Sequence, residues 1–345
     1  AVKIAAHLGH EKVIRVILEK GFQVNHNDML CNASSCGYTS IVQLLIDHGA
    51  DVNAQGGEYG TALLAASFEG HLEVIQLLID HGADVNAKGG KYGTALNAAS
   101  YMDNLKVVQL LIDHGVDVNA QGGVHGTALN AASYRGSFKL VQLLIDHGAD
   151  VNARGGQFGT ALNAALYTVD NLEVIQLLID HGADVNAQGG RYGIPLQPAS
   201  HWGHTRVVQL LLDNGADVNA QGGHFGTALQ AASCEAHTIA QLLVDHGADV
   251  NAIGGIFGTA LHAASFHGHV ALVQLLLRHG AHVNEDTGGI TPLWNASFKR
   301  HQQIVELLIQ NGATVNTQGY YGTALQVASM YHQDSVMNIL LKHGA

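Results

Sequence analysis

Histidine is the residue of this chain with the widest chemical use, because it can bind metal ions and transfer protons near neutral pH. The chain has 23 histidines, and eight of them recur at one position, directly before a glycine: His48, His81, His114, His147, His181, His246, His279 and His343. Zinc ligands must all lie about 2.0–2.1 Å from the ion. Side chains one repeat apart are separated by the ~8–10 Å spacing of packed helices. The column therefore predicts residues that contact the carbonyl end of a helix dipole, and no metal site.

Other residue types that could do chemistry are equally regular. Six further histidines share a position in a turn and are predicted to form hydrogen bonds there: His10, His71, His204, His237, His269 and His301. Serine, histidine and aspartate recur on different sides of each repeat, so they cannot converge as a nucleophile, a base and an orienting group must. Glycine pairs such as Gly56-Gly57 neither follow a buried strand nor precede the Lys-Ser/Thr of a P-loop. We therefore predict no catalytic residues, no metal and no cofactor.

The net charge bears on the partner. The 28 acidic residues outnumber the 16 basic ones and give a formal charge of −12, which opposes binding to nucleic acid and to anionic membranes. Half of the acidic residues fall in two columns that begin with Asp47 and Asp51. We interpret these columns as a solvated edge. The alternative is an edge that attracts a basic partner and releases it as salt rises.

Cysteine use and hydropathy bear on the compartment. Cys31, Cys36 and Cys234 are too few and too irregularly spaced for a disulfide framework or a zinc site, which favours a reducing compartment. The sequence has no apolar run near the ~20 residues that cross a bilayer. Its first twenty residues are charged, unlike a signal peptide. These features predict an intracellular location, cytoplasmic or nuclear, without a membrane partner.

Two phrases recur with a step of about 33 residues. The first, close to DHGADVNA, has its first glycine at Gly49, Gly82, Gly115, Gly148, Gly182, Gly215, Gly247, Gly280 and Gly312. The second, GTALxAAS, has its threonine at Thr61, Thr94, Thr127, Thr160, Thr227, Thr259, Thr291 and Thr323, and Ile194 replaces one threonine. A period of this length is typical of proteins in which each repeat is one small supersecondary unit.

One repeat can be interpreted residue by residue. Thr61 is suited to cap a short helix over 62–68, and the apolar residues of 72–81 predict a second helix buried on most sides. Gly82 can end that helix in the left-handed conformation. The segment 50–60 is rich in turn-forming residues and predicts a projecting hairpin finger. Neither helix can bury its apolar face alone, so the units must stack into an all-α solenoid of about eleven helix-turn-helix units.

The period, the GTALxAA phrase and the GADVN phrase together resemble the ankyrin repeat family over essentially all of residues 1–345. This resemblance implies a single array that binds a protein or peptide and has no active site. The GG-x-aromatic-GTALxAAS phrase is also similar to the C-terminal arrays of fungal NACHT-type NTPases of the NOD-like class. The narrower resemblance implies a nucleotide-dependent switch elsewhere in a longer protein, with this array as its sensor. Because the pattern is interrupted at both ends, we expect the chain to be a fragment of such a protein.

Several positions depart from the pattern. Gln230 and Gln326, three residues after a threonine, predict capping boxes. The first finger has lost about five residues, and Asp28 is predicted to cap the helix that follows it. Pro198 removes a hydrogen-bond donor and predicts a distorted first turn near residue 195. An extra residue around Val169, a missing one after His237 and a short finger at 285–290 are all predicted to fall in turns.

Two columns vary from repeat to repeat while their neighbours hardly change, as recognition positions do in a repeated scaffold. The finger column consists of Glu58, Lys91, Val124, Gln157, Arg191, His224 and Ile256. The helix column consists of Glu69, Met102, Arg135, Thr168, Trp202, Glu235, His267, Lys299 and Tyr331. By resemblance to ankyrin domains, both columns are expected to face the concave groove between the fingers and the first helices. We predict that the members between residues 58 and 267, apart from Glu235, bind the partner.

Aromatic residues lie beside both columns. The finger rings are Tyr59, Tyr92, Phe158, Tyr192, Phe225, Phe257 and Tyr321. The helix rings are Phe68, Tyr101, Tyr134, Tyr167, Phe266 and Phe298. The finger rings either pack over the glycine pairs or contact a ligand, and the helix rings leave the same choice open. We include Phe68, Tyr101, Tyr134, Tyr167, Phe266 and also His201 among the candidate binding residues.

These observations predict a non-enzymatic array that recognises a protein or peptide, because aromatic anchors among mixed charges are what protein interfaces favour. The alternative is a structural spacer without a specific ligand. A spacer has no use for two variable columns on one face. An enzyme would need a convergent polar pocket, which these residues do not supply.

Overall fold

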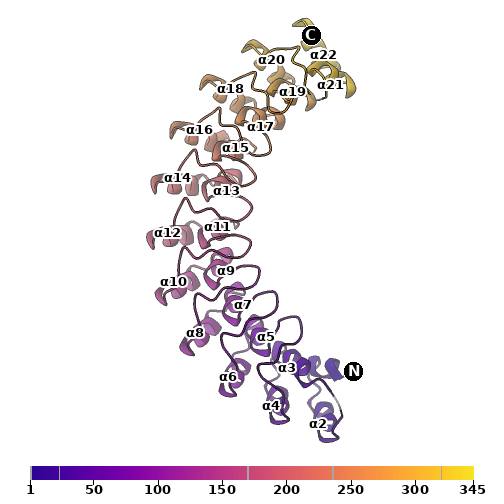
Figure 1. The fold of residues 1–345 in the computed structure, drawn as a ribbon, viewed down its shortest axis with the longest axis vertical. Helices are drawn as coiled ribbons and strands as arrows, with labels where there is room; N and C mark the ends of the chain where they lie inside the picture. The colour runs from indigo at the N-terminus through magenta and orange to yellow at the C-terminus, as the bar shows by residue number, and fades with distance from the viewer. Residues whose placement is uncertain (1, 23, 169–170, 235–236, 320) are drawn as a thin grey trace. The chain divides into compact units, whose positions relative to one another are not determined.

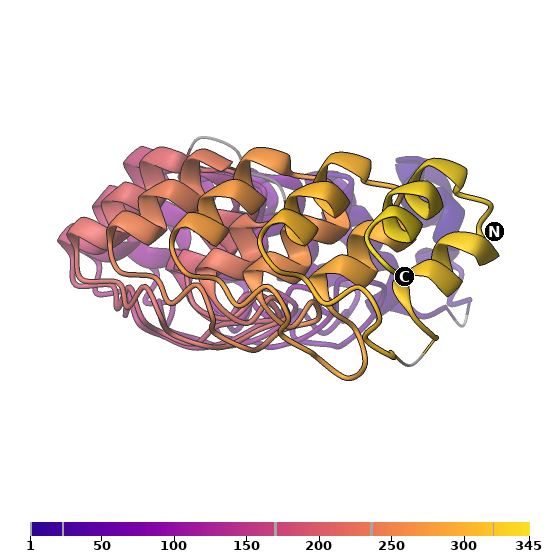
Figure 2. The same cartoon turned by 90° about the horizontal axis from the view of Figure 1, so that it is seen from above.

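The structure is a computed structural model, and it describes residues 2–22, 24–168, 171–234, 237–319 and 321–345. It divides into two compact units, Ala1–Asp184 and Val185–Ala345. Each unit is a stack of paired short helices joined by turns, with loops between successive pairs (Figure 1). Within each unit the loops lie together on one side of the helices (Figure 2). The described residues form 22 helices and isolated bridges only, which confirms the all-α solenoid.

The helix pairs follow the predicted repeats. Unit 1 contains α1 (Val2–His7), α2 (Glu11–Glu19), α3 (His26–Ser35), α4 (Thr39–Asp47), α5 (Ala62–Glu69), α6 (Leu72–Asp80), α7 (Ala95–Tyr101), α8 (Leu105–Asp113), α9 (Ala128–Arg135), α10 (Phe138–Asp146), α11 (Ala161–Ala165) and α12 (Leu172–Asp180). Unit 2 contains α13 (Leu196–His201), α14 (Thr205–Asp213), α15 (Ala228–Ala232), α16 (His237–Asp245), α17 (Ala260–His267), α18 (Val270–Arg278), α19 (Pro292–Phe298), α20 (Gln302–Gln310), α21 (Ala324–Met330) and α22 (Asp334–Lys342).

Threonine caps start most of the first helices. The Thr61 hydroxyl accepts a hydrogen bond from the Leu64 N–H at 3.2 Å, which satisfies one of the donors that the first turn leaves without a helical partner. The capping boxes at Gln230 and Gln326 are confirmed, since each glutamine side chain also accepts from the backbone N–H of its cap threonine.

Two irregular helix starts differ in outcome. The prediction that Asp28 caps α3 is wrong: the Asn25 side chain accepts from the N–H groups of Asn27 and Asp28, because the shortened finger lets the helix begin earlier. The turn before α13 is irregular, because Ile194 and Pro195 provide no side-chain cap and the helix starts one residue later than α5 does relative to Thr61. The amide of Gln197 accepts from the Ile194 N–H at 3.0 Å instead. The predicted insertion at Val169 lies outside the described residues. The prediction that a residue is missing from a turn after His237 is wrong, because His237 is itself the first residue of α16.

The core is a spine of small and branched apolar side chains. The alanine-rich first helices pack side by side and bury residues such as Ala65 and Leu63, while the second helices bury Ile75 and Leu78 against them. Fully burying one such leucine or isoleucine contributes roughly 1.5–3 kcal/mol. No helix among the described residues is long and apolar enough to cross a membrane.

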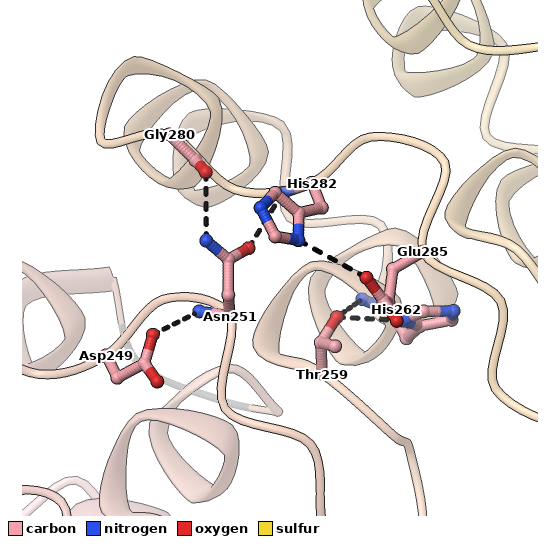
Figure 3. Close-up of polar contacts among 7 residues, drawn as sticks. All are labelled: Asp249, Asn251, Thr259, His262, Gly280, His282 and Glu285. Atoms are coloured by element: carbon pink, nitrogen blue, oxygen red, sulfur yellow. Dashed lines mark hydrogen bonds and ion pairs between the residues drawn. The ribbon is translucent and has the colours of Figure 1, made fainter.

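The GADVN phrase joins neighbouring repeats through its asparagine. Asn251 donates a hydrogen bond to the Gly280 carbonyl at 3.0 Å and accepts one from the His282 N–H at 2.8 Å, both in the next repeat (Figure 3). Asp249 accepts from the Asn251 N–H at 2.9 Å and so orients the asparagine. The aspartates of the second acidic column therefore stabilise the turns of the scaffold through hydrogen bonds.

Both histidine columns have the predicted scaffold roles where their contacts are described. His81 at the end of α6 donates from Nδ1 to the Leu77 carbonyl at 2.8 Å, which requires the proton on Nδ1 because a carbonyl can only accept. His71 in the turn donates from Nε2 to the Ser35 carbonyl of the preceding repeat at 3.0 Å. His269 and His301 make the same contact in unit 2.

Candidate binding surface

The fingers stack so closely that many of their glycines leave no space for a side chain. Within a finger, the Gly56 N–H donates to the Gly60 carbonyl at 2.6 Å and closes the hairpin. A Cβ on Gly90 would collide with the carbonyl of Tyr59 in the preceding finger, and one on Gly123 would collide with the backbone of Tyr92. The repeated GGxxG phrase is therefore explained by backbone packing between fingers.

Hydrogen bonds between fingers bring the finger column into a continuous row. The Val124 N–H donates to the Lys91 carbonyl at 3.1 Å, and the Gln157 N–H donates to the Val124 carbonyl at 2.9 Å. In unit 2 the His224 N–H donates to the Arg191 carbonyl at 3.2 Å. Backbones joined in this way lie about 5 Å apart, whereas packed helices lie ~8–10 Å apart. Side chains of the finger column are thus close enough for one ligand to contact several.

The finger rings and helix rings of unit 1 alternate in a single run, which we call the ring ladder. The centroid distances are 5.3 Å for Tyr59–Phe68, 4.6 Å for Phe68–Tyr92, 5.4 Å for Tyr92–Tyr101, 4.6 Å for Tyr101–His125, 5.5 Å for His125–Tyr134, 4.8 Å for Tyr134–Phe158 and 4.5 Å for Phe158–Tyr167. These spacings are typical of attractive aromatic pairs. The finger rings pack between helix rings, so they are part of the scaffold.

His125 is a member of the ladder that cannot be recognised from its residue type. It lies two residues before Thr127, the position of every finger ring, and only 5% of it is exposed. Its position in the repeat identifies it, whereas a search for Phe, Tyr and Trp does not. Burial and, as the smaller cause, the nearby charge of Lys91 together lower the pKa of His125 to about 4. The ring is therefore neutral at neutral pH.

In unit 2 the ladder contains smaller members. His201 takes a helix-ring position and stacks on Phe225 at 4.2 Å. Cys234 takes the next one and is buried in a cluster with Phe225, Ala231 and Ala263. Phe257 packs against the same cluster, so a thiol fills the place of a ring there.

The candidate residues divide into exposed side chains and half-buried ones. Those exposed are Glu58, Glu69, Lys91, Met102, Val124, Arg135, Gln157, Arg191, Ile256 and His267. Those half-buried are Phe68, Tyr101, Tyr134, Tyr167, Thr168, His201, Trp202, His224 and Phe266. The surface is thus a floor of ring edges beneath rows of exposed variable side chains.

The charged members of the rows lie over the rings. The Lys91 ammonium is 5.6 Å from the centroid of Tyr92, and the Arg135 guanidinium is 5.5 Å from that of Tyr101. The Tyr59 hydroxyl donates to Glu69 at 2.9 Å. Burial raises the pKa of Tyr59 to about 12, and this hydrogen bond to Glu69 acts in the same direction. Tyr59 is therefore a hydrogen-bond donor, and the mixture of charges and rings is suited to contact another protein.

Comparison with known families agrees with the repeat and its geometry. The family model for ankyrin repeats, which describes three copies, matches residues 1–56, 30–122, 122–189, 192–254 and 261–345. No curated protein matches the chain. Since the family model covers most of the residues, and the helix pairs and fingers have the form that the model's repeats require, the chain belongs to the ankyrin repeat family.

Proposed function

We propose that this chain binds a protein or peptide along the surface formed by the finger column, the helix column and the ring ladder. The observation that carries the proposal is the exposure of two variable rows above a scaffold whose other positions repeat. Ankyrin repeats are protein-interaction modules in general and are typically non-catalytic. The closer spacing of fingers than of helices is what a concave binding face requires, and it supports the same surface.

The side chains of the finger column and the helix column favour one class of partner, a polypeptide. Arg135, Lys91 and Glu69 place charges of both signs beside half-buried rings, which favours a polypeptide over an apolar metabolite. The formal charge of −12 opposes a nucleic acid. The similarity of the GG-x-aromatic-GTALxAAS phrase to arrays of fungal NACHT-type proteins supports a sensor role within a longer intracellular protein.

The test uses two double variants with the same change in charge. Peptides that bind the 345-residue chain are selected from a display library, and their dissociation constants are measured by titration. Lys91→Glu with Arg135→Glu alters the two rows, and we expect at least tenfold weaker binding. Lys106→Glu with Lys139→Glu alters exposed lysines of α8 and α10 on the second helices and should change affinity less than twofold. Equal losses in both variants, or a loss only in the second, would overturn the proposal.

A further inference from the structure

The ring ladder has a gap in unit 2. Two residues before each repeated threonine the described fingers carry an aromatic or histidine side chain, but Gly289 takes this position before Thr291. The finger is also one residue shorter, with six residues between Asn284 and Thr291 where the finger before Thr61 has seven. It closes through the Thr287 N–H, which donates to the Ile290 carbonyl at 3.0 Å, and the Gly289 N–H, which donates to Asp286 at 2.6 Å.

The helix rings on the two sides of the gap keep the spacing that holds a third ring elsewhere. In unit 1, Tyr101 and Tyr134 are stacked with centroids 6.3 Å apart, and His125 contacts both. In unit 2, Phe266 and Phe298 are stacked with centroids 6.4 Å apart, and their finger contributes only Gly289. The frame for a ring is therefore present without its ring.

The Lys299 ammonium lies over both helix rings, 4.3 Å from the centroid of Phe266 and 5.4 Å from that of Phe298. Arg135 likewise lies over Tyr101, one repeat before it, although His125 completes the ladder there. Lys299 thus occupies the ordinary place of the helix column.

A pocket of about 530 Å³ opens beside the gap. Its apolar wall includes Phe257, Phe266 and Ile256, and Ile256 is 56% exposed although it is large and apolar. Its polar rim includes Asp286 and Asn295. A volume of this order is that of a small-ligand site, and it exceeds the needs of one side chain. Apolar walls formed by rings favour an aromatic occupant, since ring edges and faces attract each other beyond their buried area.

We propose that this pocket beside the ladder gap binds an aromatic side chain of a partner peptide that has a basic residue next to it. The inference rests on the proposed function, because it assigns one anchor of the polypeptide that the surface binds. The aromatic ring packs against Phe257 and Phe266, which form the apolar wall of the pocket. The adjacent lysine or arginine lies toward the carboxylate of Asp286 at the rim, with Glu285 next to it in the chain.

The test measures a small probe on the full 345-residue chain. The peptide acetyl-Lys-(4-fluoro-Phe)-Lys-amide is titrated and followed by its fluorine NMR signal, and unlabelled Lys-Phe-Lys, Lys-Leu-Lys and Glu-Phe-Glu peptides compete. We expect Lys-Phe-Lys to displace the probe at least fivefold more effectively than either of the other two. Displacement by Lys-Leu-Lys at the same concentration would show that no aromatic ring is recognised, and displacement by Glu-Phe-Glu would show that the rim does not select a basic neighbour.

Variants test whether the probe binds in the pocket beside the gap. Ile256→Ala and Asp286→Asn should each raise the dissociation constant at least fivefold. The controls are Val16→Ala, an exposed apolar residue of α2 outside the variable columns, and Asp150→Asn, which also accepts a backbone hydrogen bond in a turn. Both should change the dissociation constant less than twofold. Absence of binding at millimolar probe, or equal effects of gap and control variants, would overturn the inference. Peptides that still depend on Lys91 and Arg135 in that case would leave the proposed function standing.

Discussion

Acidification from pH 7.5 to 4.5 should weaken unit 1 through His125, which the ring ladder holds in its neutral form. The pKa of an unfolded histidine is about 6.5, and burial lowers that of His125 to about 4. Between these values the unfolded chain binds a proton that the folded chain does not, so the free energy of unfolding falls as the pH falls. The stabilisation is complete above about pH 6.5 and is lost by about pH 4.

The magnitude follows from the difference between the two pKa values. A shift from 6.5 to about 4 corresponds to at most roughly 3.5 kcal/mol, since one unit is about 1.4 kcal/mol. Because the interval from pH 7.5 to 4.5 stops short of full protonation of the folded chain, we expect about 2 kcal/mol over this interval. This is a large fraction of the stability of one repeat and its interfaces.

Two reciprocal variants isolate the effect from the other titrating groups. His125→Phe keeps a ring at the position and should remove about 2 kcal/mol of the pH dependence measured by urea unfolding and by hydrogen exchange in α9. Phe158→His places an imidazole at the equivalent, buried position of the next finger and should add a dependence of the same sign. An imidazole signal of His125 that titrates near pH 6.5, or equal pH profiles for the His125→Phe and unaltered chains, would refute the reasoning.

Two further predictions concern the scaffold. Gly90→Ala should destabilise the chain by at least about 2 kcal/mol in urea unfolding, because the new methyl group meets the Tyr59 carbonyl and the residue has a positive φ. The control is Gly82→Ala, where φ is also positive but the space is open, and it should cost only about 1 kcal/mol. Equal losses would argue against close packing of the fingers. Asn119→Ala should cost about 1–3 kcal/mol, because it leaves the Gly148 carbonyl and the Asp150 N–H of the next repeat without their partner; a loss below about 0.5 kcal/mol would mean that this link between repeats contributes little.

The elements that local chemistry determines could be predicted from the sequence. Thr61 caps α5 through a bond three residues along the chain, and the same spacing identifies the capping box at Gln230. The eleven helix pairs follow from the same short-range signals. The cap of α3 was predicted wrongly because Asn25 and Asp28 could both serve, and the shortened finger, whose path the sequence does not determine, decides between them.

The exposed rows of the candidate surface could be predicted from the sequence, but the packing of the rings beneath them could not. Variation along the finger column identified exposed positions such as Lys91 and Ile256. The alternation of finger rings and helix rings depends on the position of each finger relative to the first helices. Local sequence patterns do not determine that position. His125 was missed for the further reason that histidines were considered only as metal ligands, helix-end residues or turn residues, although this imidazole serves as a ring of the ladder.

The ring ladder couples binding to stability. Repeated polar residues such as Asn53 and His71 join neighbouring repeats by hydrogen bonds to backbone carbonyls, so these links do not depend on which side chains the variable rows carry. A ligand that packs on the edge of Tyr134 instead adds contacts to a ring that already holds a finger against a helix. Because such a ligand binds only the folded repeats, it must stabilise them by about 2.7 kcal/mol at a hundred times its dissociation constant. The ladder would then carry the energy of recognition into the central repeats of unit 1, because the same rings hold the fingers against the first helices.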